Sequence, residues 1–171
     1  DFSCWSVNRA VKTGLPAIER VVTVSGPSIT KPSNFRCRVG TPISCLIEAA
    51  GGFKGDADKL LMGGPMMGNA VYSDEVPVIK GTNALIALPE TMNRSKEQPV
   101  CIRCGRCVAA CPMHLQPLYL YAYSLKGDVR ELDRLHVTDC MECGCCAYSC
   151  PGRLQIVQAI KNAKVLVKTK K

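Results

Sequence analysis

The residues in this sequence best suited to chemistry are its twelve cysteines, which are distributed very unevenly along the chain. The spacing C-x2-C-x2-C-x3-C, followed directly by proline, occurs twice. The first copy consists of Cys101, Cys104, Cys107 and Cys111, and the second of Cys140, Cys143, Cys146 and Cys150. A duplication with identical spacing indicates that both groups bind the same kind of centre.

The spacing has a physical explanation in iron–sulfur chemistry. Three thiolates at three-residue intervals on a looped backbone can all point at iron atoms of one cube. The fourth cysteine lies too far along, and in two-cluster proteins it ligates the other cluster. We therefore expect two 4Fe-4S clusters with crossed ligation. The first cluster is predicted to take Cys101, Cys104, Cys107 and Cys150, and the second Cys140, Cys143, Cys146 and Cys111.

Zinc and disulfides explain the cysteines less well. Zinc sites with four cysteines usually show paired C-x2-C knuckles, without a third cysteine at the same interval and a fourth before proline. Disulfides are disfavoured because cysteines within each group are too close in sequence to pair efficiently. Gly105 and Gly144, at equivalent places in both repeats, favour clusters because a residue without Cβ lets backbone N–H groups approach sulfur.

The two repeats differ in the charge beside their ligands. Arg103 and Arg106 in the first repeat correspond to Glu142 and Cys145 in the second. Positive charge favours the reduced, more negative state of a cluster. We therefore expect the first cluster to have the higher reduction potential.

The remaining candidates for chemistry have no supporting pattern. The cysteines outside the predicted ligand set are expected to be small core residues: Cys4, Cys37, Cys45 and Cys145. His114 and His136 are the only histidines, and neither has a carboxylate or nucleophile at a suggestive spacing. The sequence therefore predicts no catalytic residue and no cofactor-binding residue beyond the cluster ligands.

Composition limits the kind of protein this can be. Of 171 residues, 47% are hydrophobic and 21% are charged, and no apolar run approaches the length of about 18 residues that a membrane-spanning helix requires. No signal-peptide pattern is visible, so we interpret the chain as not secreted. The formal charge of +8 falls once thiolates bind iron, and a mildly basic surface favours acidic partners or an anionic membrane over nucleic acid.

The elements that must position the cysteines follow from hydrophobic periodicity. A short helix is expected after Thr41-Pro42, where Thr is a suitable N-cap and Pro suits the first helical position. The cysteine region is predicted to be mainly α-helical, with helices broken at Gly127-Asp128 and a helix at its end. Four segments have β-strand patterns: residues 21–24, 35–39, 59–62 and 84–88. This order indicates a small α+β roll before the cysteines.

Several other segments are distinctive in combination with the cysteine repeats. They are IERVVTVSG (residues 18–26), VGTPISCLIEAAGG (39–52), LLMGGPMMG (60–68) and PVIKGTNALIAL (77–88). Together with the repeats they resemble the C subunits of the bacterial Rnf (Rsx) ion-translocating electron-transport complexes. The cysteine pattern alone is shared by many ferredoxins, but its combination with these segments is quite specific.

The resemblance implies an α+β fold in which a small β-grasp domain of the SLBB type precedes a mainly α-helical two-cluster ferredoxin domain. We expect the β-grasp domain at residues 20–90, a linker at 91–97, the two-cluster domain at 98–165 and a basic tail at 166–171. Family members carry a larger N-terminal domain that binds FMN and NADH. Residues 1–19 would be the terminal helix of that missing domain, so FMN and NAD(H) are assigned to no residue here.

The resemblance also implies an electron-transfer subunit of an ion-translocating ferredoxin:NAD oxidoreductase, without a substrate-transforming site in this chain itself. The partners would be other subunits of a membrane complex, with ferredoxin or NAD(H) as redox partners through the complex and no nucleic acid. The expected location is the cytoplasmic face of the bacterial cell membrane, with peripheral attachment.

Two other functions stay open at this point. A cobalamin reductase of the propanediol-utilisation type resembles the same family and shares the cluster motif. A ligand-binding module whose clusters are structural or sensory belongs to a different class of protein.

Overall fold

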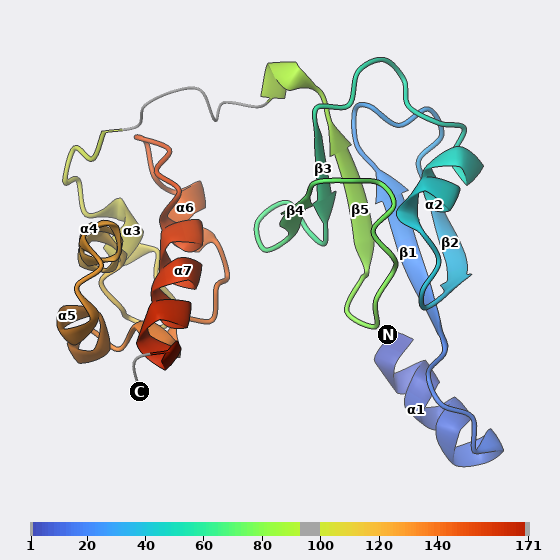
Figure 1. The fold of residues 1–171 in the computed structure, drawn as a ribbon, viewed down its shortest axis with the longest axis horizontal. Helices are drawn as coiled ribbons and strands as arrows, with labels where there is room; N and C mark the ends of the chain where they lie inside the picture. Colours follow the sequence, from blue (N-terminus) through green and yellow to red (C-terminus); the bar gives the residue numbers. More distant parts are fainter. Residues whose placement is uncertain (1, 93–99, 170–171) are drawn as a thin grey trace. The chain divides into compact units, whose positions relative to one another are not determined.

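A computed structural model describes residues 2–92 and 100–169, and the chain divides into two compact units, residues 1–96 and 97–171. Figure 1 shows the helices and strands of both units, and each unit has its own hydrophobic core. Most of the predicted linker at residues 91–97 lies outside the described residues. Its first two residues, Thr91 and Met92, end the 3-10 helix η1, Glu90–Met92.

The first unit is a five-stranded sheet with one helix inserted and one helix before it. The elements in chain order are α1 Phe2–Thr13, β1 Glu19–Ser25, β2 Ser33–Arg38, α2 Ile43–Ala49, β3 Lys59–Met62, β4 Asn69–Val71 and β5 Ala84–Leu88. The strand order is β2-β1-β5-β3-β4. Strands β1 and β5 run parallel at the centre, and all other neighbours are antiparallel. A parallel pair needs a long connection, which here contains α2.

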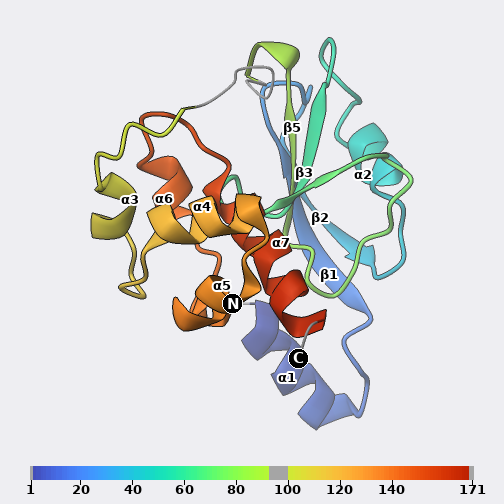
Figure 2. The same ribbon diagram turned by 60° about the vertical axis from the view of Figure 1, so that its left-hand side comes forward.

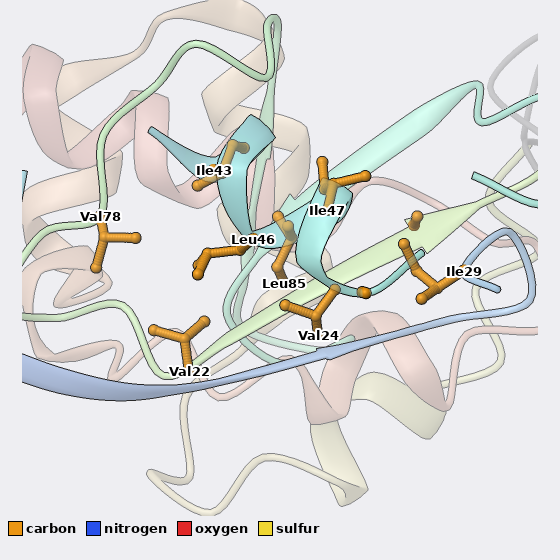
Figure 3. Packing of buried hydrophobic residues seen from close by; sticks show 10 residues of the cluster. Val22, Val24, Ile29, Ile43, Leu46, Ile47, Val78 and Leu85 are labelled. Atoms are coloured by element: carbon orange, nitrogen blue, oxygen red, sulfur yellow. The ribbon is translucent and has the colours of Figure 1, made fainter. Parts of the chain in front are cut away.

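Helix α2 covers one face of this sheet (Figures 1 and 2). Figure 3 shows Leu46 and Ile47 of α2 in one cluster with Val22 and Val24 of β1 and Leu85 of β5. All five side chains are buried. Apolar side chains at alternating positions of β1 and at helical spacing on α2 therefore form one core between the two layers.

The four predicted strands and the short helix are present in this unit, but the bounds of β1, β2 and α2 differ from the predicted ones by one or two residues, and one strand is additional. Helix α2 begins at Ile43 with Pro42 as its N-cap, one residue later than the predicted start. Strand β4 was not predicted, because its three residues are largely exposed and too few to show an alternating pattern. It pairs with β3 across the GGPMMG loop, in which the Gly68 N–H donates to the Gly64 carbonyl oxygen at 2.8 Å.

Helix α1 is attached to the sheet by charge and ring contacts. The Glu19 carboxylate of β1 pairs with Arg9 of α1 at 3.1 Å and with Arg36 of β2 at 2.5 Å. Both guanidinium groups lie 5.4 Å from the ring centre of Trp5. Hydrogen bonds from Arg36 and Arg9 lower the pKa of Glu19. The described side chains of α1 are exposed or half-buried, so these contacts fix its position more than core packing does.

The second unit is helical, as predicted, with no strand among its described residues. Its long C-terminal helix α7 contacts α4, α5, α6 and η2 and buries an apolar stripe against them. The elements are α3 Arg106–Ala109, α4 Pro117–Lys126, α5 Val129–Arg134, η2 Val137–Asp139, α6 Cys145–Tyr148 and α7 Ile156–Thr169. Helix α7 thus extends into the range expected as a basic tail, of which residues 170 and 171 lie outside the described part. Across the described helices, none combines the length and apolarity needed to cross a membrane.

The expectation that the unassigned cysteines lie in the core is wrong for Cys4 and Cys45, which are exposed. Cys4 lies on α1, which buries no described side chain. Cys45 lies on the face of α2 opposite the one that packs on the sheet, as its helical position requires. Cys37 and Cys145 are half-buried, and burial raises the pKa of the Cys37 thiol.

Truncation of the sheet core should destabilise the first unit. Leu85 is 0% exposed, so Leu85→Ala should lower the free energy of unfolding by about 2–5 kcal/mol through lost burial and a cavity. The control is Ile79→Ala, at a side chain 54% exposed, with an expected change below about 0.5 kcal/mol. Hydrogen–deuterium exchange of β1 peptides across a urea titration measures both values. Equal losses would contradict this core.

Thiol reactivity should separate Cys45 from Cys37. Iodoacetamide should modify Cys45 faster at about pH 8, because thiolate accessibility governs this reaction. Cys37 is half-buried, and burial raises the pKa of its thiol. Its modification rate should therefore still increase with pH above 9.0, the ordinary pKa of a thiol. Peptide mass spectrometry of the intact protein follows both rates. A Cys37 thiol that reacts as fast as Cys45 near neutral pH would show that the strand is not covered.

Candidate metal centres

A first cavity in the second unit collects thiols from both repeats. It encloses about 400 Å³ of space, partly open to solvent, between the Val100–Cys107 loop and the helices α4 and α7. The cysteines in its wall are Cys101, Cys104, Cys107 and Cys150. Three of them come from the first repeat and the last one ends the second repeat.

A second cavity, with about 360 Å³ of space, has the reciprocal composition. The cysteines in its wall are Cys111, Cys140, Cys143 and Cys146. The structure therefore brings all eight cysteines of the repeats to two places, four at each. This grouping supports the crossed ligation that the spacing predicts.

Electrostatic interactions among the thiols follow the same division. Burial raises the pKa of Cys107, and the charges of Cys150 and Cys104 raise it further. Burial also raises the pKa of Cys146 to about 12, and the other three thiols of its own cavity act in the same direction. Because such effects weaken with distance, the thiols of each set lie near one another.

The two repeats have the same backbone conformation. Gly105 and Gly144 both have left-handed φ angles, 75° and 85°, and each precedes a one-turn helix, α3 or α6. Arg103 and Glu142, two residues earlier, have φ of 54° and 58°, a region that residues with a Cβ seldom adopt. A Cβ on Gly105 would meet no protein atom within 4 Å, so lack of space does not require glycine here. The left-handed backbone conformation does favour it.

The arrangement of the thiols fits a multi-iron core and not a single ion. Within residues 2–92 and 100–169, no three His, Cys, Asp or Glu side chains converge as one metal ion requires. Four thiolates on zinc would place all four sulfurs about 2.3 Å from one point. The sulfurs of each set instead surround a cavity, as ligands at the corners of an iron–sulfur cube do. The donor chemistry therefore fits two 4Fe-4S clusters.

Apolar side chains form the rest of both walls. Leu118 and Tyr121 of α4 and Ile156 of α7 line the first cavity, and Val157 and Ile160 of α7 line the second. Tyr121 thus packs beside the cysteines of the first cavity. Shielding from water by these walls strengthens the effect of any charge placed beside the clusters.

A cationic contact at the second repeat was not apparent from the sequence. Lys164 Nζ of α7 lies 2.7 Å from Glu142 Oε1 and also donates to the carbonyl oxygen of Cys140. Lys161 Nζ lies 4.0 Å from Glu142 Oε2. The only sequence signal is that both lysines share a face of α7, and the other lysines nearby obscure it.

Similarity to known protein families gives the same two-part organisation. A family model described as the SLBB domain matches residues 21–70, and one described as the 4Fe-4S dicluster domain matches residues 93–151. A dicluster domain of this type implies two 4Fe-4S clusters. The mixed α+β fold, with a sheet unit before a helical cluster unit, is thereby confirmed.

The curated relatives that the chain matches are much longer proteins. Over 159 residues the chain is 47% identical to the C subunit of the ion-translocating oxidoreductase complex of Rhodobacter capsulatus, covering 93% of this chain and 31% of the relative. Over 118 residues it is 42% identical to the C subunit of the proton-translocating ferredoxin:NAD(+) oxidoreductase complex of Clostridium ljungdahlii, covering 69% and 26%. The C subunit of the ion-translocating oxidoreductase complex of Erwinia tasmaniensis is 42% identical over 127 residues, covering 74% of this chain and 16% of the relative.

The chain thus spans less than a third of the length of these relatives. Similarity extends over both units, and it agrees with the resemblance that the sequence segments predict. The chain belongs, as a homologue of part of the protein, to the family of C subunits of the ion-translocating oxidoreductase complexes, with an SLBB domain followed by a 4Fe-4S dicluster domain.

Proposed function

We propose that this chain is the electron-carrying region of a C subunit in an ion-translocating ferredoxin:NAD oxidoreductase complex. The observation that carries the proposal is the division of the eight repeat cysteines between two cavities, each built from both repeats. The kind of complex is inferred from the relatives named above, which are C subunits of ion-translocating oxidoreductase complexes. The chain holds and shields redox centres, and none of its own residues is assigned to transform a substrate.

The ligand assignment follows the two cavities. For the first cluster it comprises Cys101, Cys104, Cys107 and Cys150, and for the second Cys111, Cys140, Cys143 and Cys146. When bound, each 4Fe-4S cluster supplies reversible one-electron transfer at a potential tuned by its surroundings. The protein contributes the thiolates, the loop geometry that aims them inward, and apolar walls from α4 and α7 that exclude water.

The domain limits and the wider assembly are part of the same proposal. Residues 20–90 would form the SLBB-like β-grasp domain and residues 98–165 the two-cluster domain, joined by residues 91–97. A preceding region of the full-length protein would bind FMN and NAD(H), and residues 1–19 would be the end of that region, although its helix α1 spans only Phe2–Thr13 and Glu19 already begins β1. Residues 166–171 would form a basic end, following the sequence boundary even though α7 continues to Thr169.

The proposed partners are the other subunits of the complex, with ferredoxin or NAD(H) exchanging electrons through it. Peripheral attachment at the cytoplasmic face of the bacterial membrane fits a chain of formal charge +8 beside an anionic surface.

Anaerobic purification followed by iron and sulfide analysis, and by EPR after dithionite reduction, tests the core of the proposal. We expect about eight irons per chain and two reducible centres. Zinc or disulfides at the repeats would refute it.

Paired double substitutions should test the crossing of ligands. If Cys101 and Cys150 serve the same cluster, Cys101→Ala with Cys150→Ala should leave about four irons per chain. Cys101→Ala with Cys111→Ala should instead remove ligands from both clusters and leave almost none. The two variants lose the same number of thiols, so each is the matched control of the other. The reverse pattern in anaerobic iron analysis would show that each repeat holds its own cluster.

A further inference from the structure

The second repeat is contacted by a lysine from a distant part of the chain. Lys164 of α7 donates one hydrogen bond to the carbonyl oxygen of Cys140 and another, of 2.7 Å, to Glu142 Oε1. Its side chain is only 16% exposed, and that of Glu142 is 32% exposed. Solvent and salt therefore screen these charges much less than they screen charges on an open surface.

The same contact holds the backbone that faces the cluster ligands. Glu142 has a φ of 58°, a conformation that is costly for a residue with a Cβ. In this conformation its backbone N–H donates to Cys140 Sγ at 3.4 Å. Lys164 binds the peptide segment on both sides of that hydrogen bond, at the Cys140 carbonyl and the Glu142 side chain. It is thereby placed to keep the N–H directed at the sulfur.

The second repeat is less negative in its surroundings than a comparison of the two repeat sequences suggests, because that comparison counts Glu142 without its cationic partners. The negative charge of Glu142 is matched by Lys164 and by Lys161, whose Nζ lies 4.0 Å from Glu142 Oε2. Burial raises the pKa of the Cys140 thiol, and the charge of Lys164 acts against this rise, in the direction that favours the thiolate. A cation close to an electron-accepting centre stabilises its reduced form, because reduction adds negative charge.

We propose that Lys164 is a positioning residue for the second cluster. Its positive charge and its hold on the Cys140–Glu142 peptide raise the reduction potential of that cluster. This inference rests on the proposed two-cluster function. It assigns opposite electrostatic effects to two residues in contact. Lys164 raises the potential, and Glu142 lowers it while serving as the anchor of the lysine.

Redox titration of the full chain with both clusters in place, monitored by EPR, tests the inference. Lys164→Gln should shift one of the two midpoint potentials to more negative values, since it removes the cation and leaves Glu142 less compensated. Glu142→Gln should shift the same midpoint to more positive values. Lys164→Arg keeps the charge and should give a smaller shift than Lys164→Gln.

Two further variants identify the cluster and the cause. Lys168→Gln removes the same charge from an exposed position on the same helix and should shift neither midpoint. Arg103→Gln, beside the first cluster, should shift the other midpoint negatively. Iron content is measured in every variant and should stay equal to that of the unaltered chain.

Opposite shifts from Lys164→Gln and Glu142→Gln would support the inference. Shifts of the same sign, no shift in Lys164→Gln, or loss of half the iron from both variants would overturn it, the last pointing to a purely structural contact. If Lys164→Gln alone loses the second cluster, the Glu142→Gln shift decides between the outcomes. A positive shift would support the inference, and a negative shift or none would overturn it. An unaltered chain without two reducible clusters would refute the proposed function instead, so the two failures are distinguishable.

Discussion

The constraint that ties the two repeats of the second unit together is that each repeat places one of its cysteines in the other's cavity. Cys150 lies in the cavity of the first repeat and Cys111 in that of the second. Local spacing can place three sulfurs, but the fourth must come from tertiary structure. Helix α7 provides that structure, because it follows the second repeat directly and lines both cavities with apolar side chains. The packing of this helix therefore shapes both proposed cluster sites.

With the proposed ligands, burial of the thiols couples cluster binding to proton release. Desolvation raises the pKa of Cys107, and it raises that of Cys146 to about 12. Iron–sulfur clusters bind thiolates, so each buried ligand must release its proton when the cluster binds. The sheet unit has no such requirement. Its core between α2 and the strands consists of ordinary aliphatic side chains.

Features set by neighbours in sequence could be predicted, and features set by distant contacts could not. The cysteine spacing, the four longer strands and the helical nature of the second unit each show a local period. Strand β4 is too short and exposed for such a signal. The exposure of Cys45 depends on which face of α2 packs, and Lys164 reaches Glu142 only through the fold. The comparison of charged residues in the two repeats is incomplete for the same reason, since it cannot include a lysine from α7.

The late position of Cys150 bears on how the protein acquires its iron. With the proposed ligands, the cavity of the first repeat lacks its last sulfur until residue 150 has left the ribosome. Neither cube can be closed on a nascent chain that carries only the first repeat. With these ligands, a cluster carrier would find two complete sets of four thiols on one polypeptide only after both repeats have been synthesised.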